Sequence, residues 1–216
     1  MNILVTGGAG YIGSTVAQQL LDAGHSVTVY DNLSSGHRAA VPAAASFVRG
    51  DTLDRAGLDA VLGGAAFDAI MHFAAFIEAG ESMREPGRFF RNNVTGALTL
   101  IDALIAHRVP RFVFSSTAGV YASKDGPLLE DDPVGPSSVY GATKYMVEQA
   151  LEWYHRIHGL RVAILRYFNA AGATGPRGEA HQPETHLIPL VLQAALGQRE
   201  SIAIFGDDYP TPDGTC

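Results

Sequence analysis

Residues 5–13 of the chain read VTGGAGYIG, at the end of an apolar run that begins at residue 2. Glycines stand at positions 7, 10 and 13, and a strand, a glycine-rich turn and a helix in this order are typical of a loop that holds a dinucleotide. Gly7 permits the tight turn, Gly10 lets the backbone approach a pyrophosphate, and Gly13 lets helix and strand pack closely. The helix start adds N–H donors and a positive dipole. A plain glycine-rich turn is the alternative that this motif leaves open.

The rest of the chain alternates between apolar runs rich in β-branched residues and stretches of helical periodicity. This alternation predicts an α/β fold with a doubly wound parallel sheet, whose ligands bind beyond the carboxyl ends of the strands. The expected strands are residues 2–6, 26–30, 46–49, 69–73, 111–115 and 161–167, and the expected helices are residues 12–23, 54–62, 92–107 and 139–158.

From about residue 169 the pattern changes, which indicates the start of a second, smaller lobe. A Gly-, Pro- and His-rich segment at 169–185 is followed by a short apolar helix near 187–196 and a strand-like run at 201–205. We therefore expect a dinucleotide-binding domain over residues 1–168 and the beginning of another lobe over 169–216.

The composition is that of an ordinary globular protein, with 216 residues of which 47% are hydrophobic and 17% charged. A net charge of −7 argues against nucleic acid or a membrane surface as partner, so we expect a small-molecule ligand. No signal peptide and no apolar run of roughly 18 residues is present, so we expect a cytoplasmic chain. The single cysteine, Cys216, fits a reducing compartment. No grouping of His, Cys and carboxylate has metal-ligand spacing, so we expect no metal.

Carboxylates after two of the expected strands suggest which dinucleotide is bound. Asp31 ends the second strand, where it can accept hydrogen bonds from both hydroxyls of the adenosine ribose and would repel a 2′-phosphate, so we expect NAD rather than NADP. Asp51 follows the third strand and is placed to reach the adenine edge, with a solvated turn aspartate as the alternative. Phe73 and Ala74 end the fourth strand where the cofactor would pass, although core packing explains them equally well.

The segment YGATK at residues 140–144 predicts a proton-transfer site, because its spacing places Tyr140 and Lys144 on one face of a helix. Lys144 is expected to lower the pKa of Tyr140 and to hold the nicotinamide ribose. Thr117 ends the fifth strand at the same edge of the sheet and can hydrogen-bond the reacting oxygen. Tyr140 would then take a proton from a secondary alcohol while NAD takes a hydride. His72, inside the fourth strand, is expected to be a core imidazole.

These motifs together resemble the extended short-chain dehydrogenase/reductase family, and within it the epimerases of nucleotide sugars. The resemblance covers essentially the whole chain. Its segments are residues 5–14 (VTGGAGYIGS), 31–33 (DNL), 92–94 (NNV), 140–144 (YGATK), 166–169 (RYFN) and 203–211 (AIFGDDYPT).

The resemblance implies a Rossmann-type fold and NAD-dependent epimerisation at C4 of a UDP-hexose (UDP-glucose/UDP-galactose) through a 4-keto intermediate, a step of galactose metabolism. It implies that Thr117 and Tyr140 contact the 4-hydroxyl of the substrate and that Asn169, Ala203, Ile204 and Phe205 line the nucleotide-sugar site. The residues it implies for NAD are Gly7, Gly10, Tyr11, Ile12, Gly13, Asp31, Asn32, Asp51, Phe73, Ala74, Asn92, Lys144 and Phe168.

Two other functions stay open beside this one: a UDP-glucuronate or UDP-pentose 4-epimerase, and a non-catalytic NAD-binding regulator on the same fold. A 4,6-dehydratase is disfavoured, because Ala118 and Gly119 stand where that enzyme carries an acid pair. His186 replaces an Asn that binds the nucleotide in some members. Family chains continue for roughly a further third, so we expect an N-terminal fragment with little activity alone, from a protein that is a homodimer at full length.

Overall fold

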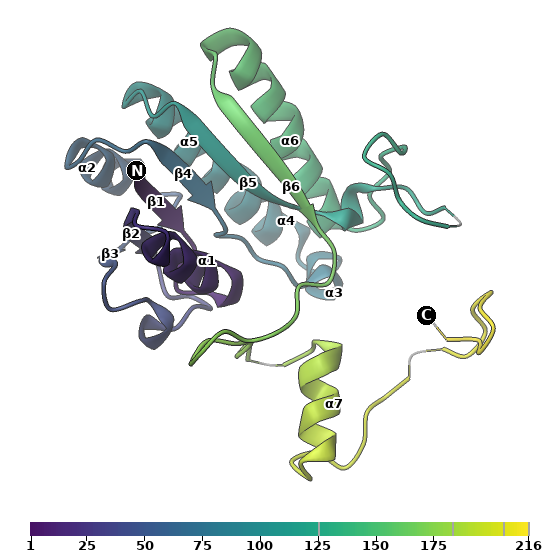
Figure 1. Cartoon of the computed structure of the whole chain (residues 1–216). Helices are drawn as coiled ribbons and strands as arrows, with labels where there is room; N and C mark the ends of the chain where they lie inside the picture. The colour runs from purple at the N-terminus through teal and green to yellow at the C-terminus, as the bar shows by residue number, and fades with distance from the viewer. Residues whose placement is uncertain (125, 183, 205, 216) are drawn as a thin grey trace. The chain divides into compact units, whose positions relative to one another are not determined.

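Six parallel strands form one sheet in the order β3-β2-β1-β4-β5-β6 (Figure 1). The structure is a computed structural model that describes residues 1–124, 126–182, 184–204 and 206–215. Because every pairing is parallel, the carboxyl ends of all six strands lie at one edge, as the alternation of elements predicts. The strands are β1 (Asn2–Thr6), β2 (Ser26–Asp31), β3 (Ser46–Arg49), β4 (Ala69–His72), β5 (Arg111–Thr117) and β6 (Arg161–Tyr167).

The expected helices are present, and shorter elements that the sequence analysis did not predict lie between them. The expected helix at 92–107 begins as a π-helical turn, Phe90–Thr95, and continues as α5 (Gly96–Ala106). The unexpected α3 (Ala79–Ser82) and α4 (Pro86–Phe89) precede it, and 3₁₀ turns occupy Arg38–Ala40 and Ala118–Val120. The remaining helices are α1 (Tyr11–Asp22), α2 (Arg55–Gly63), α6 (Val139–His158) and α7 (Leu187–Ala195).

Helices cover both faces of the sheet, which makes it doubly wound. On one face α2, α5 and α6 pack on the sheet around buried side chains such as Leu58, Leu100 and Phe112. On the other face α1 packs through Ala17 against Val29 and its neighbours. Burial of these apolar surfaces supplies the main driving force for folding.

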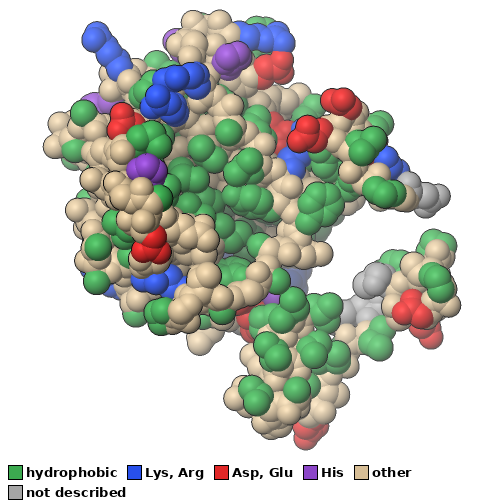
Figure 2. All heavy atoms as spheres, viewed as in Figure 1, with side chains coloured by type: hydrophobic (Ala, Val, Ile, Leu, Met, Phe, Trp, Pro, Cys, Tyr) green, Lys and Arg blue, Asp and Glu red, His purple; other side chains and the backbone are tan. Residues whose placement is uncertain are grey.

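The part of the α1 face that lies over β5 and β6 carries exposed apolar side chains. Val113 and Ser115 of β5 pair in register with Ala163 and Leu165 of β6, and Leu165 is 41% exposed. Figure 2 shows hydrophobic side chains gathered on this face of the molecule.

The chain divides into two compact units, the first of residues 1–170 with 174–177 and the second of residues 171–173 with 178–216. In the second unit α7 exposes an apolar surface that includes Leu187 and Ile188. The strand expected at 201–205 is absent over residues 201–204, and Phe205 lies outside the described residues. A strand is stabilised by hydrogen bonds to a neighbouring strand, and none of the residues described here pairs with 201–204.

In the part of the chain that the structure describes, none of the helices combines the length and the apolar character that crossing a membrane requires.

The glycine-rich turn is packed tightly against its neighbours. Gly7 has a left-handed backbone (φ +72°), and its N–H donates to the Tyr30 carbonyl of β2 at 3.0 Å. A Cβ on Gly7 would lie 2.4 Å from the Ala74 nitrogen, and a Cβ on Gly13 would lie 2.2 Å from the Gly7 carbonyl oxygen. Because these neighbours are backbone atoms, they cannot move aside as a flexible side chain could.

We expect Gly13→Ala to lower the free energy of unfolding by at least about 2 kcal/mol, because the added methyl group forces α1 away from the turn. Gly87→Ala in α4 is the matched control, since a Cβ there meets nothing within 4 Å, and its effect should stay within about 0.5 kcal/mol. Urea unfolding of the two variants measures the difference. Equal midpoints for Gly13→Ala and the wild type would show that the packing is looser than described.

Candidate functional site

The carboxyl ends of β1, β2, β4 and β5 bring the residues expected at the site to one edge of the sheet. Parallel sheets bind ligands where the strand order reverses, which here is between β1 and β4. The turn after β1 leads into α1 with Gly10 at its N-cap. Gly10 has no side chain to cap the helix, and a Cβ there would approach only the Gly7 carbonyl, at 3.4 Å. The start of α1 is therefore suited to an anionic group.

Asp31 holds the turn against the end of β2. Its Oδ2 accepts from the Ala9 N–H at 2.9 Å and its Oδ1 accepts from the Leu33 N–H at 2.8 Å, and only 7% of the residue is exposed. Leu33 has a positive φ of 61°, a left-handed conformation that costs a non-glycine residue about 1 kcal/mol or more. Strain of this kind is common where a loop is shaped for a ligand.

Asn32 and Asp51 lie side by side at the ends of β2 and β3. The Asn32 amide donates to Asp51 Oδ2 at 2.9 Å, while Asp51 Oδ1 accepts from the Leu53 N–H at 2.9 Å. The structure thus brings together Asp31, Asn32 and Asp51, three of the side chains expected to bind NAD.

The loop after β4 touches the glycine-rich turn and is fixed by a residue that sequence reasoning did not select. Asn93 is 3% exposed, and its side chain binds both the N–H and the carbonyl of Phe76, at 2.9 and 3.0 Å. It also donates to Thr143 Oγ1 of α6 at 3.2 Å and accepts from the side chain of the expected site residue Asn92. Asn93 therefore ties the loop after Phe73 and Ala74 to the helix that carries Tyr140.

Tyr140 and Lys144 lie in the first turns of α6, close to the end of β5. Ser138 caps the helix by accepting from the Gly141 N–H at 3.1 Å, and the Tyr140 N–H donates to Ser82 Oγ at 3.0 Å. A Cβ on Gly141 would lie 2.4 Å from the Gly119 carbonyl oxygen. This close approach brings α6 beside the turn that follows Thr117.

Lys144 is buried, at 3% exposure, and points at the end of β5. Its ammonium donates to the Ser115 carbonyl at 2.8 Å and lies 5.0 Å from the centre of the Phe114 ring and 5.9 Å from that of Tyr140. Thr117 accepts from the Gly119 N–H at 3.1 Å through its hydroxyl. The three residues expected to carry proton transfer are thus near one another.

A second buried network lies one helical turn beyond Lys144 and was not expected from the sequence. Glu148 is 6% exposed, accepts from the Ser116 hydroxyl, and is held in a bidentate ion pair by Arg166 at 2.7 and 3.1 Å. The Arg166 guanidinium also lies 4.6 Å from the centre of the Tyr121 ring. This network joins β5, α6 and β6 beside the proton-transfer residues, and burial of a charge is tolerated because the pair is hydrogen-bonded.

The residues expected to bind the nucleotide sugar are described in two separate parts. Asn169 follows β6 in the first unit and is exposed, as is its neighbour Phe168, which is expected to contact NAD and is 66% exposed. Ala203 and Ile204 lie in the second unit and are exposed as well. Phe205 lies outside the described residues.

The sequence of residues 3–214 matches the model of the NAD dependent epimerase/dehydratase family. The chain belongs to this family. It is 51% identical to a UDP-glucose 4-epimerase of Corynebacterium glutamicum and 52% identical to one of Rhizobium meliloti, each over all of this chain. It spans 65% and 66%, respectively, of the length of those relatives.

Solved structures agree with this membership. The chain resembles the UDP-glucose 4-epimerase of Brucella ovis in complex with NAD, with a TM-score of 0.95, 45% identity and coverage of 100% of this chain and 67% of that one. It also resembles the enzyme of Stenotrophomonas maltophila with bound NAD and formylated UDP-arabinopyranose, with a TM-score of 0.94, 39% identity and coverage of 100% and 68%. The Rossmann-type fold expected from the sequence is thereby confirmed.

The electrostatics of this epimerase-family chain differ from one expectation. Burial raises the pKa of Tyr140, the Thr117 hydroxyl opposes this by hydrogen bonding, and Glu78 adds to the rise. The net direction is upward, so the expected lowering of the Tyr140 pKa by Lys144 is wrong for this structure. The reason is that burial lowers the pKa of Lys144 itself, to about 7, which weakens it as a cation near neutral pH.

His72 is the core imidazole that the sequence analysis expects. It is 2% exposed, shares a 2.7 Å hydrogen bond between its Nδ1 and the Thr6 hydroxyl, and stacks on Phe114 with ring centroids 6.0 Å apart. Burial, with a contribution from the Lys144 charge, lowers its pKa to about 3. The ring is therefore neutral at physiological pH.

The low pKa of Lys144 predicts a pH dependence of stability. Between about pH 7 and 10.5 the unfolded chain keeps the lysine proton that the folded chain has released, so the free energy of unfolding rises with pH by up to about 1.4 kcal/mol per unit. Below pH 7 both states are protonated and this contribution is constant. Lys144→Met should remove the slope, as urea unfolding from pH 6 to 10 would measure.

Lys124→Met, in an exposed loop, is the matched control and should keep the wild-type slope. A slope unchanged in Lys144→Met would mean that the Lys144 amine is solvated in the folded chain.

Proposed function

We propose that the chain carries the cofactor-binding and proton-transfer half of an NAD-dependent 4-epimerase of UDP-hexoses. The observation that supports this most strongly is the convergence of Thr117, Tyr140 and Lys144 at the edge of the sheet where the glycine-rich turn also lies. The names of the relatives, UDP-glucose 4-epimerases, support the substrate class. The cytoplasmic location, the homodimer at full length and the division of the chain at residue 168 stay predictions.

The residues present fit NAD on two observations. The N-cap of α1 is a glycine whose side-chain position is open apart from the Gly7 carbonyl, which suits a close approach by phosphate. Each oxygen of Asp31 accepts one backbone N–H and keeps a second lone pair for a ribose hydroxyl. Asn32, Asp51, Phe73, Ala74, Asn92 and Phe168 would complete the contacts, together with Tyr11 and Ile12 at the start of α1.

When bound, NAD would supply the hydride acceptor for C4 of the hexose and return the hydride to the other face of the 4-keto sugar. Tyr140 would receive the proton of the 4-hydroxyl and later give it back. Because burial raises the pKa of Tyr140, a neighbour has to favour its phenolate, and Thr117 is the residue whose hydroxyl does so here. Lys144 would hold the ribose, with its amine positioned by the Ser115 carbonyl.

By the resemblance, Asn169, Ala203, Ile204 and Phe205 would contact the nucleotide sugar. A nucleotide sugar bound in this way is positioned for reaction by groups remote from C4, and positioning of reactants contributes a large part of enzymatic rate acceleration.

The cofactor assignment predicts that the chain binds NAD at least about 10-fold more tightly than NADP. A 2′-phosphate beside the Asp31 carboxylate would place like charges within a few Å of each other in a partly desolvated position. Asp31→Asn should bring the ratio of the two dissociation constants close to one, while Asp22→Asn, at the exposed end of α1, should leave it unchanged. Calorimetric titration measures both ratios, and equal wild-type affinities for the two cofactors would refute the assignment.

The proton-transfer assignment predicts that Tyr140→Phe lowers turnover by about 10²–10⁴-fold with little effect on NAD affinity, since only the hydroxyl is removed. Tyr145→Phe, on the same helix, is the matched control and should retain wild-type turnover. The assay is conversion of UDP-galactose to UDP-glucose by the complete gene product. Wild-type turnover in Tyr140→Phe would exclude the mechanism, and NAD binding without any turnover in the wild type would favour a regulator.

A further inference from the structure

Two copies of a Glu-x-His motif precede α7 in the sequence, at Glu179–His181 and at Glu184–His186. In the first copy Glu179 Oε1 accepts from the N–H of Ala180 and of His181 and contacts His181 Nδ1. In the second copy Glu184 Oε1 accepts from the N–H of Thr185 and of His186 and lies 2.8 Å from His186 Nδ1. Each motif thus places a carboxylate oxygen and an imidazole nitrogen side by side.

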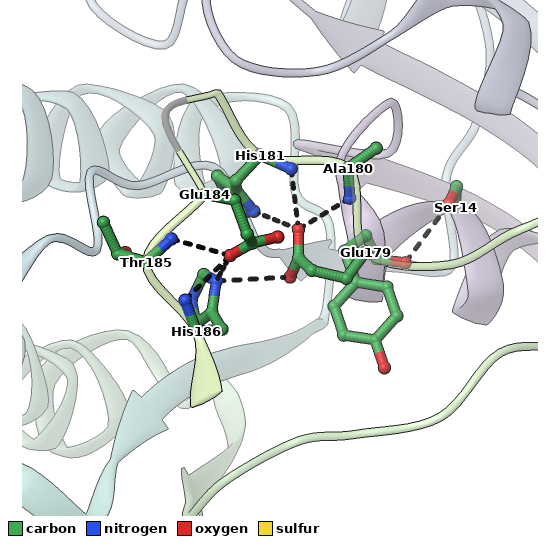
Figure 3. Close-up of polar contacts among 8 residues, drawn as sticks. Ser14, Glu179, Ala180, His181, Glu184, Thr185 and His186 are labelled. Atoms are coloured by element: carbon green, nitrogen blue, oxygen red, sulfur yellow. Dashed lines mark hydrogen bonds and ion pairs between the residues drawn. The ribbon is translucent and has the colours of Figure 1, made fainter. Parts of the chain in front are cut away.

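The two Glu-x-His motifs lie next to each other, as Figure 3 shows. His186 Nδ1 lies 3.9 Å from Glu179 Oε2, and the rings of His181 and His186 have centroids 5.2 Å apart. One ligand atom each from Glu179, His181 and His186 lies within 4.8 Å of the other two. Donors around a tetrahedral ion with bonds of about 2.0–2.1 Å stand about 3.3 Å apart. Glu184 Oε1, which lies 2.8 Å from His186 Nδ1, is the candidate for a fourth donor.

The carboxylates of this group are largely withdrawn from water. The side chains of Glu179 and Glu184 are 14% and 12% exposed, and that of His181 is 20% exposed. Two shielded carboxylates beside two imidazoles leave net negative charge when the rings are neutral, and a divalent cation would neutralise it. His186 is 43% exposed, which leaves one side of the group accessible.

A cavity of about 620 Å³ adjoins the group. Glu179, His181 and Glu184 line the cavity together with residues of α7 and of the segment after it, including Leu192, Leu196 and Arg199. All of these residues belong to the second unit.

We propose that Glu179, His181, Glu184 and His186 form a binding site for a divalent transition-metal ion of the Zn²⁺ class. Two imidazole nitrogens and two carboxylate oxygens suit Zn²⁺ or Co²⁺, whereas Mg²⁺ and Ca²⁺ prefer oxygen ligands throughout. The site holds α7 to the loop before it. It goes beyond the proposed epimerase function and shares one residue with it, since His186 stands where some family members carry an Asn that binds the nucleotide. The pattern E-x-H-x₂-E-x-H is not a familiar ligand spacing, and for that reason no metal is expected from the sequence alone; the contacts described above point to one.

The test is titration of the 216-residue chain with Co²⁺ and Zn²⁺, followed by calorimetry and by the visible absorption of Co²⁺. The chain carries Cys216→Ser, so that its single thiol cannot bind the ion. We expect one ion per chain with a tetrahedral Co²⁺ spectrum, displaced by Zn²⁺ and not by Mg²⁺. His181→Asn and His186→Asn should each weaken binding by at least about 100-fold, since even the loss of an outer-shell partner costs 10–100-fold.

His107→Asn is the matched control, because His107 pairs with a single carboxylate, Asp59, at 2.9 Å. It should bind Co²⁺ as the wild type does. Circular dichroism checks that each variant is folded, and Glu184→Gln, which keeps the side-chain shape, provides a second test if a histidine variant is not. Binding that persists in the double variant His181→Asn/His186→Asn, or a wild type that binds no more Co²⁺ than this variant, would overturn the proposal.

Discussion

The contact between the Gly7 carbonyl and the backbone at Gly13 is the constraint on which the rest of the first unit depends. It sets how closely α1 approaches β1, and the same turn also meets β2 through the Tyr30 carbonyl and the loop after β4 through Ala74. The close contact between Gly7 and Gly13 therefore positions the ends of β1, β2 and β4. Asp31 stabilises the glycine-rich turn, because its carboxylate accepts a hydrogen bond from the Ala9 N–H inside the turn. The residues that fix the fold are thus the residues proposed to hold the cofactor.

On the other face of the sheet, α6 carries the proton-transfer residues, and there too the contacts that fix the fold also position the site. Gly141 allows the helix to approach the turn after Thr117, and Asn93 and Glu148 fasten its neighbouring turns to the loop after β4 and to β6. Tyr140 is therefore held by contacts on both sides of its own turn. Groups that take part in proton transfer need such fixed positions, because small displacements of a reacting group lower the rate strongly.

Much of this could be predicted from the sequence, and the exceptions have physical causes. The strands, the long helices and the glycine-rich turn depend on local pattern, and they were predicted within a few residues. Asn93 and Glu148 were missed because they act on partners far along the chain, Thr143 fifty residues away and Ser116 thirty-two residues away. The upward shift of the Tyr140 pKa depends on burial, which the spacing of Tyr140 and Lys144 does not reveal. A strand at 201–205 was predicted from the apolar run there, but strand formation also needs a partner, and the described residues 201–204 have none.

The parallel strand order has a consequence for how the chain folds during synthesis. β1 pairs early with β2, yet its other edge faces β4, and contacts such as that between Asn2 and Asp68 join residues sixty-six positions apart. At translation rates of about 5–20 residues per second, that edge of β1 waits on the order of 3–13 s for its partner. An apolar strand with an open edge is prone to pair with other chains. The central strand of the sheet is thus also the segment that a ribosome-associated chaperone would have most reason to shield.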